Sequence, residues 1–353
     1  MESTRKRESV LRDLEALMGI PSPTGMTGAC AAWVAEELRK LGFSPAVTRK
    51  GAVVCTVSGD RQDRGLLLCA HLDTLGMVVR AVKPNGCLRY SKLGGWNDNA
   101  VENENVLIHT RTGKTFTGTV QSVHASRHVW GDTTEEKRSD EGLEIVVDEE
   151  TWSREATEAL GIGPGDVVSF DPRFTVTPVG FVKSRFLDDK ASAAVLLTLA
   201  REIAAGDLTP VRRTVLAFTV YEEIGQGAST LYRENVEDIV ALDMGCVGDD
   251  LSCHENQLSI CAKDAAGPYD WDLTNELIAR ARRLGLPYAV DVYPRYSSDT
   301  ATALPAGLDA RFACFGQGVY ASHGYERTHV KGLLAALALA EDLVAAEAES
   351  APQ

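Results

Sequence analysis

The stretch LLLCAHLD, residues 66–73, indicates the class of this fold. Leu66–Ala70 is an uninterrupted apolar run, typical of a short strand buried on both faces of a sheet, and it ends at His71. In sheets built from parallel strands, binding and catalytic sites form at the carboxyl ends of the strands. The stretch therefore predicts an α/β fold in which His71 and Asp73 emerge where a site would form.

Helical and strand-like patterns alternate on both sides of a central region. Residues 8–20, 27–41, 191–205 and 271–284 have helical spacing or composition, and short apolar strands separate them. Strands that alternate with helices predict a mostly parallel sheet with helices on both faces.

The central region has a different character. From Val78 to Pro178 the chain shows short alternating runs broken by glycine and asparagine, which predict an inserted, small β-barrel-like domain. A chain of 353 residues is long enough for two domains. We therefore expect a discontinuous catalytic domain, 1–77 and 179–353, interrupted by a β domain at 78–178.

Composition excludes several classes of protein. The net charge of −14 argues against a nucleic-acid partner, because phosphates are bound by basic surfaces. No apolar run is long enough for a membrane span, and the charged N-terminus lacks a signal-peptide core. The eight cysteines are scattered without a CxxC pair, so no disulfide framework is expected. We expect a cytoplasmic protein.

Acidic and histidine residues cluster where apolar strands give way to loops. The clusters are His71 with Asp73, Asp188 with Asp189, Glu222 with Glu223, Asp243, and His323. A carboxylate two positions after a histidine is a familiar ligand-and-orienter pair, and adjacent carboxylates repel one another unless a cation is near. Taken singly, each cluster also has a structural explanation, such as Asp189 capping the next helix.

Taken together, the clusters match the requirements of a two-metal site. One first-row metal ion needs three or four nitrogen or oxygen ligands, and two ions about 3.5–4 Å apart need a bridging carboxylate. Two histidines and three carboxylates supply that set: His71, Asp188, Glu223, Asp243 and His323. Glu222 remains free to act as a base. This ligand set suits zinc, cobalt and manganese alike.

The sequence resembles metallopeptidase family 42, the glutamyl-aminopeptidase and tetrahedral-aminopeptidase group, nearly from end to end. The resemblance lies in AHLDTLG (70–76), GGW (94–96), LDDK (187–190), EEIG (222–225) and SHGYE (322–326). It implies a zinc-peptidase-like catalytic domain that carries the β insert.

The resemblance also implies roles for the clustered residues. Asp188 bridges two divalent ions, with zinc the first expectation and cobalt or manganese the alternatives. His71 and Asp243 complete one ion site, and Glu223 and His323 complete the other. Asp73 supports His71, and Glu222 is the general base that activates a water shared by the ions. The implied enzyme removes N-terminal residues from short peptides and is a dimer-based homo-oligomer, with dodecamers known in the family.

Three alternatives compete with this interpretation. The same site could serve a dipeptidase or deacylase that acts on an N-acylated or osmolyte-related dipeptide. A related carboxypeptidase and deacylase family uses a similar ligand set, but it places its extra domain after the fourth ligand, whereas here the insert lies between His71 and Asp188. A metal-free binding protein is the third alternative, and Glu222 argues against it because a structural cage needs no additional carboxylate.

Overall fold

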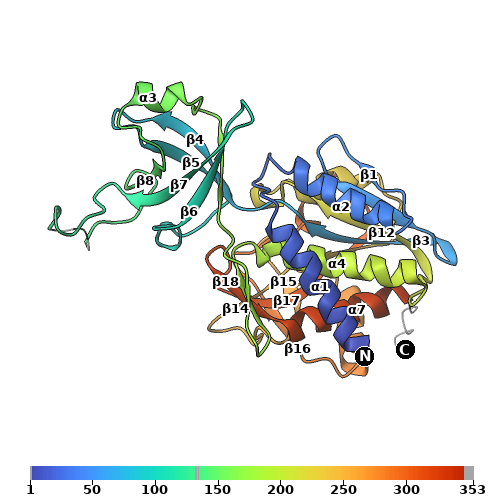
Figure 1. Ribbon diagram of the computed structural model, residues 1–353. Coiled ribbons are helices and arrows are strands. Elements are labelled where there is room, and N and C mark those ends of the chain that lie inside the picture. The colour runs from blue at the N-terminus through green and yellow to red at the C-terminus, as the bar shows by residue number, and fades with distance from the viewer. Residues whose placement is uncertain (1, 132, 134, 346–353) are drawn as a thin grey trace.

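The protein has two parts, a large sheet covered by helices and a small closed barrel at one end of it (Figure 1). The structure is a computed structural model and describes residues 2–131, 133 and 135–345. Residue 1 and residues 346–353 of the predicted catalytic domain lie outside the described residues.

Twelve strands form the large sheet. They are β1 (Ala46–Val47), β2 (Val53–Val57), β3 (Arg61–His71), β10 (Thr175–Val176), β11 (Phe181–Ser184), β12 (Arg212–Thr219), β13 (Asp238–Leu242), β14 (Gly245–Val247), β15 (Leu258–Lys263), β16 (Tyr288–Val292), β17 (Arg311–Tyr320) and β18 (Glu326–His329). The helices around this sheet are α1 (Glu2–Met18), α2 (Gly28–Lys40), α4 (Leu187–Ala205), α5 (Trp271–Arg283), α6 (Thr300–Ala303) and α7 (Val330–Ala345), with the short helices η2 (Glu222–Ile224) and η3 (Gly227–Arg233).

The sheet is mixed, with its parallel strands at the centre. The main order is β1-β2-β12-β3-β13-β17-β18-β11-β10, and β14, β15 and β16 attach beside β17. The pairs β12–β3, β3–β13 and β13–β17 are parallel, whereas the pairs outside them along this order are antiparallel. The predicted α/β class is confirmed; along the main order the parallel pairing is confined to these four strands, and β14–β17 and β15–β16 are further parallel pairs beside it.

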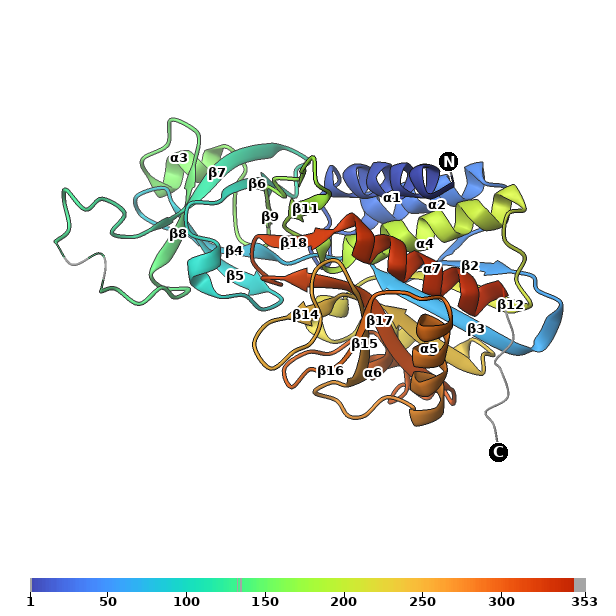
Figure 2. The same cartoon turned by 90° about the horizontal axis from the view of Figure 1, so that it is seen from below.

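Both faces of β3 are buried from Gly65 to His71, as the apolar run of this strand predicts. Leu66, Leu68 and Ala70 belong to the main core with α1, α2, α4 and α7, which lie together on one side of the sheet (Figure 2). Leu67 and Cys69 belong to a second core with residues of η3 and α6 on the other side. Successive residues of a strand point to opposite faces, so an unbroken apolar run is needed to fill both cores.

Helix α4, which carries Asp188 at its beginning, is buried along most of its length. Every residue from Ser184 to Ala200 is buried, and regular helical backbone begins only after Asp188 and Asp189. Two carboxylates are therefore held inside the protein at the point where a buried helix begins. Burying ionised carboxylates costs free energy unless they are paired or bound to a cation.

The barrel contains β4 (Gly76–Val82), β5 (Leu88–Leu93), β6 (Asn105–His109), β7 (Thr115–Ser122), β8 (Leu143–Val147) and β9 (Val167–Phe170), in the closed order β4-β5-β8-β7-β6-β9. It also carries η1 (Asp98–Ala100) and α3 (Arg154–Ala159). The predicted barrel-like insert is confirmed. Strand β10, inside the predicted insert, pairs with β11 of the large sheet, so the boundaries at 78 and 178 stay a prediction.

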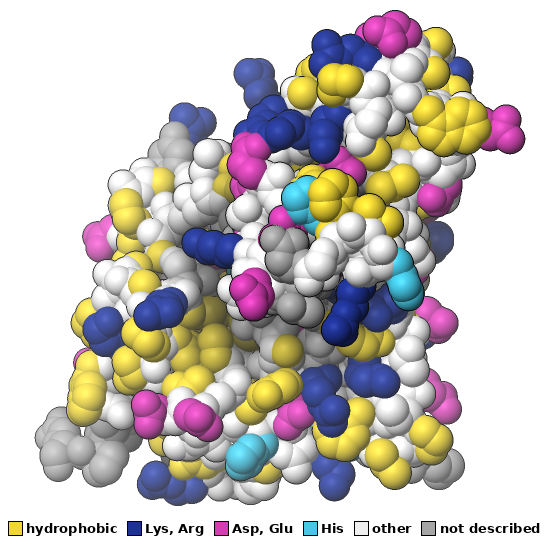
Figure 3. All heavy atoms as spheres, turned by 90° about the vertical axis from the view of Figure 1, so that its left-hand side faces the viewer, with side chains coloured by type: hydrophobic (Ala, Val, Ile, Leu, Met, Phe, Trp, Pro, Cys, Tyr) yellow, Lys and Arg dark blue, Asp and Glu magenta, His cyan; other side chains and the backbone are white. Residues whose placement is uncertain are grey.

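The exposed end of the barrel has mixed charge. On the face shown in Figure 3, Lys and Arg side chains are interspersed with Asp and Glu side chains and with apolar groups. Among the described residues, no helix is both long enough and apolar enough to cross a bilayer.

Candidate metal centre and active site

The candidate residues meet because they follow neighbouring strands. His71 ends β3, Glu223 lies in η2 after β12, and Asp243 follows β13. Asp188 begins α4, and His323 lies in the turn between β17 and β18. The carboxyl ends of adjacent parallel strands lie at one edge of a sheet, so residues far apart in the sequence come together there.

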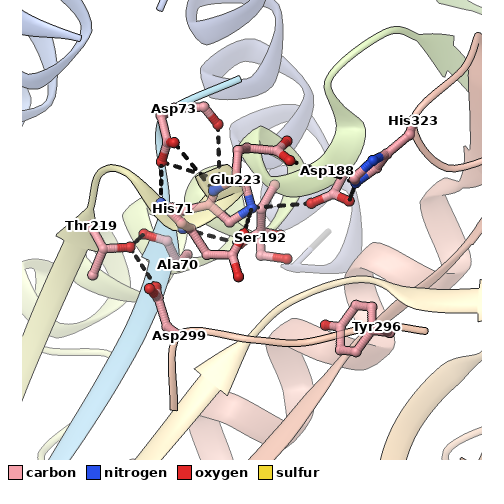
Figure 4. Close-up of polar contacts among 12 residues, drawn as sticks. Ala70, His71, Asp73, Asp188, Ser192, Thr219, Glu223, Tyr296, Asp299 and His323 are labelled. Atoms are coloured by element: carbon pink, nitrogen blue, oxygen red, sulfur yellow. Dashed lines mark hydrogen bonds and ion pairs between the residues drawn. The ribbon is translucent and has the colours of Figure 1, made fainter. Parts of the chain in front are cut away.

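Asp188 belongs to two groups of potential ligands. His71, Asp188 and Asp243 form one group, and Asp188, Glu223 and His323 form the other, with the ligand atoms of each group within 4.8 Å of one another. Oδ1 of Asp188 lies 3.1 Å from Nε2 of His71, and Oδ2 lies 3.3 Å from Nε2 of His323 (Figure 4). One carboxylate thus presents one oxygen to each group, which is the arrangement a bridging ligand needs.

Two of the five candidate ligands each have a buried carboxylate oxygen with no hydrogen-bond partner among the described residues. These oxygens are Oε1 of Glu223 and Oδ1 of Asp243. A buried polar atom without a partner costs about 1–3 kcal/mol, and more when it is charged. Asp243 and Glu223 belong to different ligand groups, so a cation in each group would give each residue a partner, and the nitrogen and oxygen donors suit a divalent transition metal. The residues present therefore fit two ions.

Charge within the site is unbalanced when only protein groups are considered. Burial, with the charge of Asp188, raises the pKa of Glu223 to about 8 and that of Asp243 well above its usual value. Burial opposes the charged form of both histidines, but hydrogen bonding to Asp188 and nearby carboxylates raise the pKa of His323 to about 11 and that of His71 well above its usual value. The excess of carboxylates makes the site attract cations or protons.

Asp73 organises the turn that carries Glu222 and Glu223. Its carboxylate accepts hydrogen bonds from the backbone N–H groups of Glu222 (3.0 Å) and Glu223 (3.4 Å), and from Oγ1 of Thr24 (2.7 Å). For His71, the nearer partner of Nδ1 is the backbone carbonyl of Asp73 at 2.9 Å, whereas the carboxylate lies 3.7 Å away. Both contacts from Asp73 therefore help to direct Nε2 of His71 toward Asp188.

His323 depends on partners to which the sequence had assigned no role. Its Nδ1 hydrogen-bonds the backbone carbonyl of Gly95, which belongs to the GGW segment between β5 and η1 (Asp98–Ala100). The carboxylate of Glu326 accepts from the backbone N–H of His323 (2.8 Å) and from that of Asp188 (3.1 Å). Glu326 belongs to the SHGYE segment, so an acidic side chain close to His323 was the one feature of the sequence that could have suggested this role. The carbonyl of Gly95 has no sequence signal.

Asp189 also supports the site. Its carboxylate accepts a hydrogen bond from the backbone N–H of His71 at 3.2 Å. The side chain is fully buried, and burial followed by the charge of Asp243 raises its pKa well above the usual value. The contact with His71 shows that Asp189 has a structural role at the site besides its place at the start of α4.

Unusual backbone conformations surround the candidate ligands. Phe186, Tyr221 and His323 have φ angles of 69°, 69° and 62°, in the left-handed region that residues other than glycine seldom adopt. Each such residue costs of order 1–3 kcal/mol, and such costs persist where the surrounding structure imposes the conformation. Each of the three is a candidate ligand or lies within two residues of one, namely Asp188, Glu223 or His323, and this strain marks the region as a candidate functional site.

The groups face a cavity of about 850 Å³. It is lined by Gly95, Trp96, Asn97, Ala100, Asp188, Glu222, Glu223, Gly225, Asp243, Met244, Cys246, Arg295, Tyr296, Ser297, Ala321, Ser322, His323, Gly324 and Tyr325. Glu222 belongs to neither ligand group; its Oε2 lies 3.7 Å from Nε2 of His71. Burial raises the pKa of Glu222 well above its usual value, so this carboxylate has a strong tendency to accept a proton.

Comparisons with known proteins identify the family. The family model for M42 glutamyl aminopeptidases matches residues 51–339. YhfE of Bacillus subtilis, a protein named as an aminopeptidase, is 39% identical over 94% of this chain and 95% of its own length. This chain belongs to the M42 peptidase family. Members of this family are metal-dependent peptidases, and this chain is accordingly a hydrolase of peptide bonds.

More distant similarities to this M42 peptidase are found both in sequence and in fold. The glutamyl aminopeptidase of Lactococcus lactis is 24% identical over 60% of this chain and 59% of its own length. The TET aminopeptidase of Thaumarchaeota archaeon SCGC AB-539-E09 superimposes with a TM-score of 0.87 at 19% identity, covering 95% of this chain and 96% of that one. The TET1 peptidase of Pyrococcus horikoshii, described as able to assemble into a tetrahedron or a large octahedral shell, gives 0.83 at 22% identity, covering 95% and 99%.

Proposed function

We propose that this M42 family member is a two-metal aminopeptidase that removes N-terminal residues from short peptides. The observation that supports this proposal best is the geometry of Asp188, whose two oxygens lie 3.1 Å and 3.3 Å from histidines of different ligand groups. A single-ion site would have no use for this arrangement. The relatives named above are aminopeptidases, which favours this activity over the deacylase alternative.

His71, Asp188 and Asp243 would hold one ion, and Asp188, Glu223 and His323 the other. When bound, such ions polarise the scissile carbonyl and lower the pKa of a water molecule toward neutrality. Zinc is the first candidate, with cobalt and manganese as alternatives, because all three accept nitrogen and oxygen donors.

Glu222 is the proposed general base. Its side chain faces the cavity and lies outside both ligand groups, so its carboxylate is free to accept the proton of the attacking water. The same carboxyl then donates this proton to the amine of the departing peptide. Asp73 fixes the backbone of Glu222 by a 3.0 Å hydrogen bond, which limits how far the base can move.

The remaining parts of the proposal concern recognition and assembly. Of the four carboxylates that line the cavity, that of Glu222 lies outside both ligand groups, so bound ions would leave its charge to attract the α-ammonium of a peptide with a free N-terminus; acetylation would remove the charge of that ammonium. We also propose a homo-oligomer built from dimers, by analogy with the assembling TET1 peptidase. All eight cysteines are free thiols, which is typical of a reducing cytoplasm and supports that location.

The decisive experiment compares two adjacent glutamates in the protein reconstituted with zinc, cobalt or manganese. Glu222→Gln should retain both metal equivalents while kcat on a free dipeptide falls about 10²–10⁴-fold, the scale expected for loss of a general base. Glu223→Gln, the matched control, should lose metal together with activity. The N-acetylated form of the same dipeptide should be a much poorer substrate of the unaltered enzyme. Loss of metal from Glu222→Gln would assign it as a ligand, and a preference for the acetylated peptide would overturn the aminopeptidase assignment.

A further inference from the structure

One wall of the cavity is a short segment, residues 293–299, that is anchored at its beginning. The ring of Tyr293 is buried and packs edge-on against Tyr296, with centroids 5.2 Å apart. The Tyr293 hydroxyl hydrogen-bonds the hydroxyl of Ser259. The backbone carbonyl of Tyr296 accepts from the N–H of Ala265 at 2.9 Å. These contacts fix the path of the chain on both sides of Arg295.

The end of the same segment is anchored by buried polar groups. The hydroxyl of Ser298 lies 2.8 Å from that of Tyr269 and 2.9 Å from that of Thr300. Asp299 is buried and accepts a hydrogen bond from the hydroxyl of Thr219. Buried hydrogen-bonded groups of this kind hold a loop in one conformation. The wall is therefore rigid, and it presents the exposed side chains of Arg295 and Ser297 to the cavity.

Arg295 differs in charge from the other groups that line the cavity. Four carboxylates line it, those of Asp188, Glu222, Glu223 and Asp243, and among the described lining residues Arg295 is the one lysine or arginine. Three of these carboxylates are the proposed metal ligands, so ions would neutralise them. Within the described part of the chain, Arg295 makes no hydrogen bond or ion pair, and its guanidinium is thus available to a ligand.

We propose that Arg295 binds the C-terminal carboxylate of dipeptide substrates. This inference rests on the proposed aminopeptidase function. The N-terminal residue of a substrate must reach the buried ligand groups, so the part after the scissile bond extends toward the opening, where Arg295 is exposed. In a dipeptide that part ends in a carboxylate. The planar guanidinium offers a carboxylate two parallel hydrogen bonds, a geometry that also gives specificity.

The test compares a neutral dipeptide with its C-terminal amide, using the metal-loaded enzyme. The unaltered enzyme should have a kcat/KM about 5- to 30-fold higher for the free acid, the factor that one or two kcal/mol represents. In Arg295→Gln this ratio should fall to about 1, mainly through KM, whereas Arg295→Lys should retain part of it. Arg282→Gln is the matched control, because it removes the same charge from an exposed residue of α5 that does not line the cavity.

A second pair of substrates distinguishes recognition of the C-terminal carboxylate from recognition of an acidic side chain of the peptide. Both are amidated at the C-terminus and begin with either glutamate or glutamine. Suppose that Arg295→Gln changes the ratio of kcat/KM for this pair and leaves the acid-to-amide ratio intact. Arg295 then binds an acidic side chain of the substrate, and the C-terminal assignment is wrong. An unchanged ratio for both pairs refutes any role in carboxylate recognition. If the unaltered enzyme cleaves none of the four peptides, it is the proposed aminopeptidase function that fails.

Discussion

The buried side chain of Arg185 connects the barrel to the loop that carries the candidate ligand His323, and we expect both the stability of the protein and its metal site to depend on it. Its guanidinium donates hydrogen bonds to the carbonyls of Gly324, at 3.2 Å, and Ala100, and forms a 3.1 Å ion pair with Glu104. Arg185 is 2% exposed. Gly324 is adjacent to His323, whereas Ala100 and Glu104 belong to the barrel side. We predict that Arg185→Met destabilises the protein and weakens the metal site that contains His323.

The size of this effect follows from the partners left behind. Two carbonyl groups lose a charged donor, and each such hydrogen bond contributes about 1.5–3 kcal/mol. Glu104 keeps its ion pair with Arg173, at 2.6 Å, so it is not left unpaired. We therefore expect a loss of about 3–5 kcal/mol, the range for breaking a buried charged network. At about 2.1 cal/mol/K of unfolding entropy per residue, this corresponds to a fall in Tm of about 4–7 °C.

Arg173→Met is the matched control, because Arg173 binds the same carboxylate from outside. Its side chain is 43% exposed, and its guanidinium also stacks on the ring of Tyr325 at 4.0 Å. An exposed ion pair and an exposed cation–π contact contribute about 1 kcal/mol together, so Tm should fall by about 2 °C or less.

Calorimetry and metal analysis of both variants decide the matter. For Arg185→Met we expect the larger fall in Tm and the selective loss of about one metal equivalent, since His323 and the carbonyl of Gly95 would no longer be held together. Equal Tm shifts for Arg185→Met and Arg173→Met would refute the argument from burial. Full retention of both ions by Arg185→Met would refute the link to the metal centre.

Three further predictions concern the metals and the barrel. Asp188→Ala should lose both metal equivalents, because it removes a ligand from each group, and a variant that retains two tightly bound ions would contradict the bridging role. Metal affinity should rise with pH, by up to about tenfold per pH unit for each proton displaced. Burial lowers the pKa of His323, but the hydrogen bond to Asp188 outweighs burial and raises this pKa to about 11, so an ion must displace a proton from the imidazole. Calorimetric titration with metal at several pH values measures this dependence. Joining Leu75 to Asp171 through two glycines should give a folded remainder with one cooperative unfolding transition, since the register of β4 and β9 brings these ends together, but its metal content should fall because Gly95 is removed.

Much of the fold could be predicted because it rests on local patterns. The apolar run of Leu66–Ala70 predicts a central strand, since both of its faces must be buried. The change to short alternating runs after Val78 predicts the barrel. Strands β15 and β18 were not predicted, because LSICAK and ERTH are short and their pairing with β17 is decided by distant residues. The antiparallel edges of the large sheet were missed for the same reason.

The candidate ligands could be identified because their chemistry is unusual for their position. Carboxylates and histidines directly after buried strands are costly unless something binds them, and this is visible without coordinates. The sequence could not show that Asp188 presents one oxygen to each group. Nor could it show that Asp73 contacts Glu222 and Glu223 through their backbone, since backbone N–H groups occur in every residue.

The sequence by itself determined which side chains are available for metal binding and which strands end beside them. The tertiary structure decided how those side chains are oriented and what holds them. The carbonyl of Gly95 reaches His323 across 228 positions, and the guanidinium of Arg185 reaches Ala100 across 85. Such contacts depend on how the barrel sits against the large sheet, and that placement results from many weak interactions between distant residues, none of which has a local signature.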